Sequence, residues 1–404
     1  MRRTLVVSSF LLLSAVSVHA QGAAVATKDE HMARALRVLS SSPLIDGHND
    51  LPWAIRESKT APHDVEAYDL RRTTVGHTDL ARLAAGHLGG QFWSVYIPGD
   101  TSVARLGFAK VQLEQIDIAR RVIAKYPERF ELVTTAAGFR QAFARGRIGS
   151  ALGLEGGHAI ENSLGALRTF YDMGGRYMTL THNQTLDWAD AAADVARHDG
   201  LSAFGKEVVR EMNRLGMLVD LSHVSPATMM DALDVAEAPV IFSHSNARAL
   251  ADHVRNVPDA VLARLKQNGG VVMITFVPGF SSQALIAWNR TPAAQRRGPA
   301  PRATLAQVAD HIEHVRRVAG VDQVGLGGDF DGITEVVEGL EDVAAYPRLF
   351  AELSRRGWSE PDMKKLAGEN VLRAFARAEQ VSARLRTSRP PSTATLEQLD
   401  GAPR

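Results

Sequence analysis

Six short apolar segments of this sequence run into an ionisable side chain at or just beyond their last residue. His48 and Asp50 follow the apolar pair Leu44-Ile45, and Glu155 ends the nearly apolar stretch IGSALGLE. The other four segments end in His182, His223, His244 and Asp329. Such groups, brought together, would repel one another without a cation. Imidazole and carboxylate ligands suit zinc, and also manganese, iron or cobalt.

The candidate ligands are sufficient for two metal ions. One ion needs three or four ligands, and five suffice for two ions if one carboxylate bridges them. The five are His48, Asp50, Glu155, His223 and His244. Two metals about 3.5–4 Å apart share a water, lower its pKa and generate a hydroxide nucleophile near neutral pH. The pattern therefore predicts a hydrolase. The sequence has no Cys and no GxSxG motif, which disfavours a cysteine or serine nucleophile.

Each of these residues also has an ordinary structural interpretation. A single histidine at the end of a strand is more often a hydrogen-bonded structural residue than a ligand, and Asp50 or Asp329 alone would serve as a helix cap or turn residue. Glu155 is different, because a buried carboxylate needs a charge partner or a metal. Five other histidines are interpreted as surface or structural residues: His158, His198, His253, His311 and His314. Trp53 and Trp188 are open to two interpretations, pocket lining or packing.

The elements that must position these side chains alternate between short apolar strands and longer helices. Strands are predicted at 43–48, 92–97, 148–155, 177–182, 217–223, 239–244, 270–276 and 323–330. Helices are predicted at 106–125, 163–173, 203–215, 226–236, 259–266, 304–318 and 361–377. Alternation implies a parallel sheet, and eight units indicate a TIM-like (β/α)₈ barrel whose catalytic face is the C-terminal end of the strands. A doubly wound open sheet is the alternative. The long connections 56–90 and 277–303 are candidate lids.

Composition and the two ends of the chain define the expected domain organisation. The 46 basic and 45 acidic residues nearly cancel, which argues against a nucleic-acid partner. Residues 1–20 resemble a signal peptide cut after Ala20, with a transmembrane anchor as the alternative. Residues 21–34 are then an N-terminal extension, 35–380 the barrel domain, and 381–404 a disordered polar tail without a membrane anchor. An exported protein, periplasmic or secreted, is expected, and without Cys it has no disulfides.

Seven segments together resemble the membrane (renal) dipeptidase family, the M19 metallopeptidases. They are IDGHNDLPW, GLEGGHAI, YMTLTHNQTLDWAD, LVDLSHVS, VIFSHSNARAL, RNVPD and GLGGDFDG, and the resemblance covers roughly 40–378. It implies a TIM-like barrel with two zinc ions per chain that hydrolyses free dipeptides, including those with a C-terminal D-residue. It also implies a homodimer.

The resemblance assigns a role to each motif residue. His48 and Asp50 would bind one zinc, His223 and His244 the other, and Glu155 would bridge them. His182 would contact the substrate and stabilise the oxyanion. Arg255 would bind the substrate carboxylate, and Asp329 would meet the free amine and shuttle a proton to the leaving nitrogen. One departure is Phe280, where mammalian members carry a tyrosine near the substrate carboxylate.

Two other functions compete with the dipeptidase. A binuclear metal amidohydrolase acting on N-acyl amino acids or lactones would use the same barrel and ligands, but it would not read a free amine. A metal-dependent periplasmic binding protein would bind without turnover. The sequence does not fix the side-chain preference or the metal used in vivo.

Overall fold

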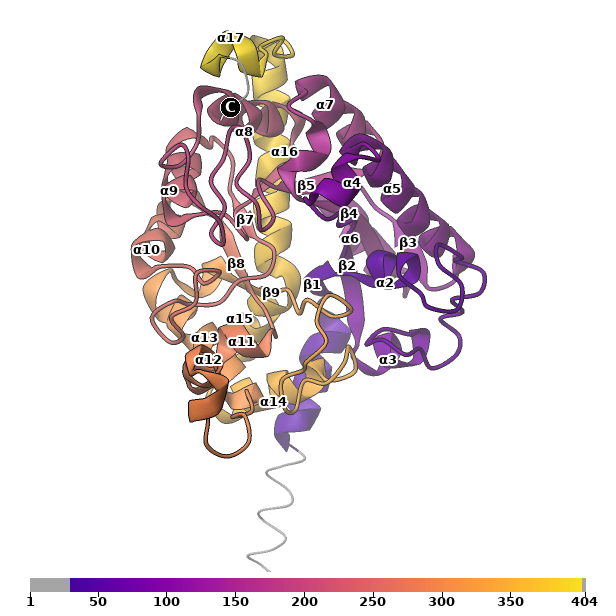
Figure 1. The fold of residues 1–404 in the computed structure, drawn as a ribbon. Helices are drawn as coiled ribbons and strands as arrows, with labels where there is room; N and C mark the ends of the chain where they lie inside the picture. The colour runs from indigo at the N-terminus through magenta and orange to yellow at the C-terminus, as the bar shows by residue number, and fades with distance from the viewer. Residues whose placement is uncertain (1–29, 402–404) are drawn as a thin grey trace, which may run out of the picture.

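A closed barrel of eight parallel strands forms the centre of the protein (Figure 1). The computed structural model describes residues 30–401. Neighbouring strands pair in the order β2-β1-β9-β8-β7-β6-β5-β4, and pairing of β2 with β4 closes the ring. The short strand β3 (Phe130–Leu132) pairs only with the beginning of β4, beside the barrel. Closure excludes the open doubly wound sheet and confirms the predicted TIM-like barrel.

The eight barrel strands are short and buried along their length. Their bounds are β1 Leu44–Asn49, β2 Leu88–Ser94, β4 Ile148–Glu155, β5 Gly175–Thr179, β6 Leu218–Asp220, β7 Ile241–Phe242, β8 Val271–Ile274 and β9 Val324–Leu326. Strands covered on both faces read as apolar runs, which is why the eight segments are visible in the sequence.

Helices surround the barrel and alternate with its strands. The long ones are α5 Phe108–Lys125, α6 Ala136–Ala144, α7 Leu164–Asp172, α8 Ala203–Leu215, α9 Pro226–Val235, α10 Asp259–Asn268, α13 Leu305–Val318, α14 Tyr346–Arg355 and α16 Asn370–Ser388. Shorter helices are α2 Leu51–Arg56, α3 Leu80–Ala85, α4 Thr101–Ala104, α11 Pro278–Ser281, α12 Gln283–Arg290, α15 Glu360–Lys364 and α17 Leu396–Asp400. A 3₁₀ turn, η1 (Gly157–Ile160), follows β4 directly.

Side chains from the first residues of the strands pack against helix α16 at the N-terminal end of the barrel. Ile45, Leu218 and Ile241 belong to one buried apolar cluster with Leu372 and Phe375 of α16. Figure 1 shows α16 as the long yellow helix behind the strands. This packing closes the N-terminal end and leaves the C-terminal end for the polar side chains.

Six of the eight predicted strands end earlier in the structure than expected, among them three whose predicted last residue is a histidine. β5, β6 and β7 end at Thr179, Asp220 and Phe242, so the histidines after them lie on the following turns. His223 has φ 69°, a left-handed conformation that is uncommon for a residue with a Cβ. Strand pairing stops where the chain must turn these side chains inward, and an apolar pattern does not mark that point.

The predicted disordered tail at 381–404 is wrong for the part of it that the structure describes. Helix α16 continues to Ser388, and α17 follows at Leu396–Asp400. The polar groups of this segment satisfy the two ends of α8. Arg386 donates to the carbonyls of Arg214 and Leu215, and Asp400 accepts from the amides of Ala203 and Phe204 at 2.9 Å each. The polar residues of this segment therefore cap the ends of α8, and the described part of the segment, up to Gly401, is ordered.

The predicted signal peptide at residues 1–20 lies outside the described residues. Within 30–401, no helix has both the length and the apolar character needed to cross a bilayer.

His311 on α13 is a structural residue, as predicted, and it joins three segments. Its Nδ1 accepts from the amide of Ala247 at 3.2 Å, and its Nε2 donates to the carbonyl of Ser281 at 3.2 Å. The side chain is 1% exposed. Burial lowers its pKa to about 4, since a second proton would occupy the nitrogen that accepts the Ala247 amide.

We therefore expect His311 to make folding pH-dependent. The ring stays neutral in the folded protein down to pH about 4, whereas in the unfolded chain it is protonated below about 6.5. Its contribution is complete above pH 6.5 and falls as the pH drops, by about 3 kcal/mol in total. His311→Asn should lower the unfolding free energy at pH 7 and flatten its decline between pH 6.5 and 4, as measured by urea titration. Parallel pH profiles for the two proteins would contradict this assignment.

Candidate metal and substrate site

A cavity of about 770 Å³ opens at the C-terminal end of the barrel. Seven of the eight predicted site residues line it, and His48 is buried directly beneath them. Those lining it are Asp50, Glu155, His182, His223, His244, Arg255 and Asp329. The structure therefore brings all eight residues to one place, although they come from seven separate segments of the chain.

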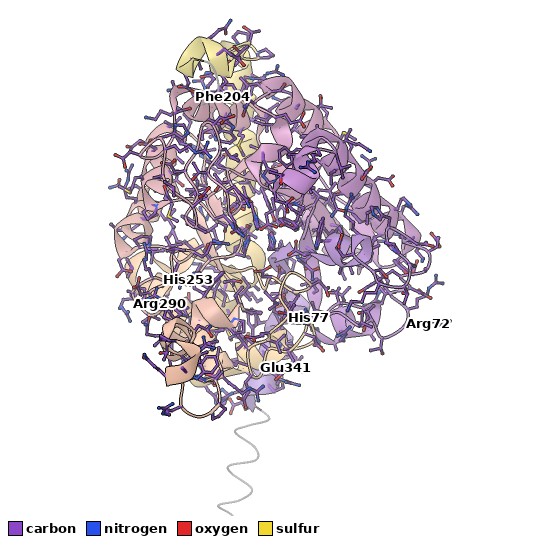
Figure 2. All side chains as sticks on the ribbon, in the orientation of Figure 1. Arg72, His77, Phe204, His253, Arg290 and Glu341 are labelled. Carbon is purple, nitrogen blue, oxygen red and sulfur yellow. The ribbon has the colours of Figure 1, made fainter. Side chains whose placement is uncertain are left out.

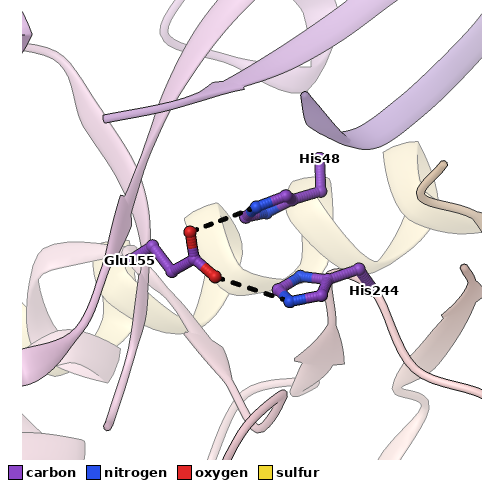
Figure 3. Close-up of side chains that lie close together, drawn as sticks. All are labelled: His48, Glu155 and His244. Atoms are coloured by element: carbon purple, nitrogen blue, oxygen red, sulfur yellow. Dashed lines mark ion pairs between the residues drawn. The ribbon is translucent and has the colours of Figure 1, made fainter. Parts of the chain in front are cut away.

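Glu155, the last residue of β4, is the central contact of this group. Its Oε2 lies 3.2 Å from His48 Nε2, and its Oε1 lies 3.0 Å from His223 Nε2 and 3.5 Å from His244 Nε2. Figure 3 shows the Glu155 carboxylate between His48 and His244. One carboxylate thus presents each of its oxygens to a different set of imidazole nitrogens.

Each of three histidines uses its second nitrogen to fix its ring. His48 Nδ1 pairs with the Tyr177 hydroxyl at 2.9 Å, and His244 Nδ1 pairs with Ser243 Oγ at 2.9 Å. His223 Nδ1 lies 3.2 Å from Asn183 Oδ1. All three rings therefore direct Nε2 into the group, and a hydrogen bond to the other nitrogen is the usual support of a metal-binding histidine.

The donor set also fits a metal because two of its inward atoms, on His48 and Asp50, lack hydrogen-bond partners. His48 Nε2 is 3.2 Å from oxygens of Asp50 and Glu155, yet it is aligned for a hydrogen bond with neither. Asp50 Oδ1 is buried and unpartnered as well. Ligand atoms of His48, Glu155 and His244 lie within 4.8 Å of one another, as do those of Glu155, His182 and His223 and those of His48, Asp50 and Asp329. These residues could hold metal ions.

The ionisable groups of this site shift one another's pKa values. Burial opposes protonation of His48, but Tyr177 and the carboxylates of Glu155 and Asp50 raise its pKa well above the ordinary value. Burial also opposes ionisation of Glu155, but His48 and His223 hold its pKa well below the usual range. The group therefore favours a positive charge beside Glu155, as a bound cation would provide.

The other two inward histidines stay neutral. Burial, with the nearby charge of Arg255, lowers the pKa of His223 well below its usual value. Burial, together with His48 and Arg255, does the same for His244. Neutral imidazole is the form that binds a metal.

Two buried carboxylates support the strand ends beneath the cavity. Asp220 on β6 accepts from the Ser243 amide at 2.8 Å and from Ser243 Oγ at 2.5 Å, and Ser243 in turn contacts His244. Asp46 on β1 accepts from the His48 amide at 2.7 Å and from the Tyr346 hydroxyl. Each carboxylate thus ties a histidine's backbone or side chain to neighbouring elements.

Tyr177 reaches His48 only because Gly153 has no side chain. Tyr177 is on β5 inside the barrel, and a Cβ on Gly153 of β4 would lie 2.0 Å from the tyrosine Cζ. Gly153 therefore makes room for the ring that orients His48.

The cavity lining combines a cation with further carboxyl groups. Arg255 is the cation: its Nη2 contacts His244 Nε2 at 2.8 Å, and its Nη1 is buried without a partner. Burial lowers its pKa to about 10, so it remains a cation at neutral pH. Asp329 and Asp331 line the same cavity, on a turn with φ 65° and 63°. A ligand with a carboxylate and an amine matches this arrangement.

Connections between the barrel elements form the cavity rim. The connection 277–303 begins with Val277 and Phe280, which line the cavity. The connection 56–90 meets the rim through His77, whose amide donates to Asp331 Oδ1 at 2.7 Å and whose Nδ1 accepts from the Asp331 amide at 2.9 Å (Figure 2). Trp53 lines the cavity, whereas Trp188 is fully buried in the core.

Sequence reasoning missed several residues of this site. Tyr177 and Asp220 carry no signal of their own, because Tyr177 contacts His48 on another strand and Asp220 contacts Ser243 in the turn after β7. Ser243, which contacts the adjacent His244, was missed as well. His253 was interpreted as a surface or structural residue, but it lines the cavity. Its position two residues before Arg255 was the available signal.

The sequence matches the membrane dipeptidase family, peptidase family M19, over residues 32–389. Similar solved structures include the probable dipeptidase PvdM from Pseudomonas aeruginosa, with a TM-score of 0.75 at 22% identity, covering 87% of this chain and 99% of that one. A metallopeptidase from Rhodobacter sphaeroides, liganded with a phosphinate mimic of the dipeptide L-Ala-D-Ala, has a TM-score of 0.72 at 27% identity, covering 83% and 99%. Dipeptidase AC, a metallopeptidase of family M19, gives 0.72 at 27% identity, covering 83% and 98%.

The family match spans most of the chain, and the dipeptidase structures are covered almost completely. The group of histidines and carboxylates is the kind of site that a metallopeptidase requires. The chain therefore belongs to the membrane dipeptidase family, peptidase family M19, and is a metallo-dipeptidase.

Proposed function

We propose that this protein is an exported, binuclear zinc dipeptidase that hydrolyses the single peptide bond of free dipeptides. The observation that carries the proposal is the position of Glu155 among the Nε2 atoms of three histidines, with Arg255 and Asp329 lining the same cavity. His48 and Asp50 would hold one zinc and His223 and His244 the second, with one Glu155 oxygen for each. When bound, two zinc ions polarise the scissile carbonyl and lower the pKa of the attacking water.

The chain's own residues would orient the dipeptide by its two charged ends. Arg255 Nη1 is buried and unpartnered, so a substrate carboxylate would satisfy it with a charge-assisted hydrogen bond. The substrate ammonium would lie against Asp329. A ligand lacking either end would leave a buried charge without its partner, which costs more than losing a surface contact.

Proton transfer and oxyanion stabilisation are assigned to Asp329 and His182. Burial, with the charges of Asp50 and Glu155, raises the pKa of Asp329 well above its ordinary value, so its carboxylate readily takes up a proton. We assign it to take the proton of the attacking water and pass it to the leaving nitrogen. Burial lowers the pKa of His182, whose neutral ring would donate a hydrogen bond to the developing oxyanion.

Three parts of the proposal rest on other support. Export rests on the signal-like residues 1–20. Acceptance of a C-terminal D-residue is supported by the similar Rhodobacter sphaeroides metallopeptidase, which binds an L-Ala-D-Ala mimic. The homodimer implied by the family resemblance stays a prediction, which analytical ultracentrifugation would test.

Glu155→Gln should abolish binding of at least one zinc. The amide offers one oxygen and carries no charge, so it cannot bridge two cations. We expect two zincs per wild-type chain by mass spectrometry of the metal, one or none in the variant, and loss of dipeptide hydrolysis. Exposed Glu57 at the end of α2 provides the control, and Glu57→Gln should keep both metals and full activity. Two zincs retained by Glu155→Gln would contradict the bridging role.

Blocking the substrate's amine should separate a dipeptidase from an N-acyl amino acid hydrolase. L-Ala-L-Ala and L-Ala-D-Ala should be cleaved, and N-acetyl-Ala-Ala should not. The acetyl group removes the positive charge of the amine that Asp329 is proposed to bind. Asp329→Asn should lower kcat by about 100-fold, the usual loss when a general acid–base group is removed. Cleavage of the N-acetyl compound alone would keep the metal site but overturn both the substrate class and the role of Asp329.

Ser243→Ala should weaken one metal site and spare the other. The change removes the hydroxyl between Asp220 and His244 Nδ1 and leaves the ring of His244 free to rotate. Loss of such a supporting hydrogen bond typically lowers metal affinity by 10- to 100-fold. Chelator competition should resolve one weakened zinc and one unchanged zinc, the latter held by His48 and Asp50. Equal weakening of both would indicate general destabilisation instead.

A further inference from the structure

Arg255 is the proposed partner of the substrate carboxylate in this cavity. Its Nη1 is buried without a partner, and its Nη2 contacts His244 Nε2, a nitrogen proposed to bind zinc, at 2.8 Å. Phe280 lies beside the guanidinium, with Arg255 Cζ 5.4 Å from its ring centroid, and it has no polar group. A carboxylate has two oxygens and accepts several hydrogen bonds, so it can take a further donor beside the guanidinium.

His253 is placed to be that donor. It lines the same cavity two residues before Arg255, and its ring stacks on Phe280 with centroids 4.4 Å apart and planes at 30°. Figure 2 shows His253 on the same side of the molecule as Arg290. Phe280 is thus a common platform that contacts both His253 and Arg255.

The hydrogen bonding of His253 defines which nitrogen carries its proton. The amide of Arg255 donates to Nδ1 at 3.3 Å, so Nδ1 is an acceptor and the proton of the neutral ring is on Nε2. Within residues 30–401, Nε2 has no hydrogen-bond partner from the protein. The half-buried ring also stays neutral, because burial and the nearby cations Arg255, Arg290 and Arg248 lower its pKa to about 4.

We propose that His253 binds the C-terminal carboxylate of the dipeptide through Nε2–H, beside Arg255, with Phe280 holding both side chains in place. The assignment rests on the proposed dipeptidase function and adds a substrate-binding residue to it. A neutral donor contributes direction without a second positive charge, so it selects a planar carboxylate over a carboxamide, whose NH₂ group would face the Nε2–H.

Two variants separate hydrogen bonding from stacking. His253→Phe keeps an aromatic ring on Phe280 and removes the donor, whereas His253→Gln keeps an amide donor near the Nε2 position. We expect His253→Phe to raise KM for L-Ala-D-Ala about 10-fold, as for a lost hydrogen bond to a charged group, with kcat within about twofold. His253→Gln should recover most of the loss. Both variants should retain the wild-type zinc content.

Substrate and ligand controls make the result specific to the carboxylate. KM for L-Ala-D-Ala amide should be high in the wild type and unchanged by His253→Phe. Calorimetric binding of a phosphinate mimic of L-Ala-D-Ala should weaken by the same factor as KM rises. Equal losses on the free dipeptide and its amide, or an unchanged KM in His253→Phe, would overturn the assignment and leave His253 a packing residue. A wild-type enzyme that cleaves no dipeptide would instead overturn the proposed function itself.

Discussion

A carboxylate buried among imidazoles is the constraint on which the rest of this structure depends. Glu155 is 4% exposed, and the Nε2 atoms of four histidines lie 3.0–3.9 Å from its two oxygens. An isolated buried carboxylate is very costly, and no Lys or Arg forms an ion pair with it in the part of the chain described. The opposite pKa shifts of His48 and Glu155 show that the group draws in positive charge. The site therefore favours the binding of cations.

The barrel can bring these histidines and carboxylates together because all of its parallel strands end at one face. Left-handed backbone at His223 and Asp329 turns those side chains inward immediately after their strands. Such conformations are strained for residues other than glycine and persist only where the surroundings enforce them. Here the enforcing contacts are buried: Asp220 joins β6 to the turn after β7, and Asp46 joins β1 to Gly328 and to Tyr346 of α14. The stability of the barrel mouth and the geometry of the site therefore rest on the same hydrogen bonds.

The cavity above this group is lined by a cation and by further carboxyl groups. Arg255, Asp329 and Asp331 all line it. Under the proposed function, a dipeptide would present its carboxylate to Arg255 and its ammonium to Asp329. A longer peptide would place an uncharged amide against one of these groups, and the cost of the unpaired buried charge would disfavour it. Specificity for two residues would then follow from charge as well as from the shape of the cavity.

The sequence by itself determined the residue types that do chemistry and the order in which strands deliver them. Apolar runs ending in His48, Glu155 or His244 are local patterns. Eight apolar runs alternating with helices were enough to predict the barrel and its catalytic end. Tertiary structure decided which partners fix those side chains. Tyr177 is 129 residues from His48, and the tail's Asp400 caps α8 from 196 residues away. It also placed His253 in the cavity, on a ring supplied by a different connection. A hydrogen bond depends on the meeting of two atoms in space, and a sequence pattern records only which atoms the chain carries.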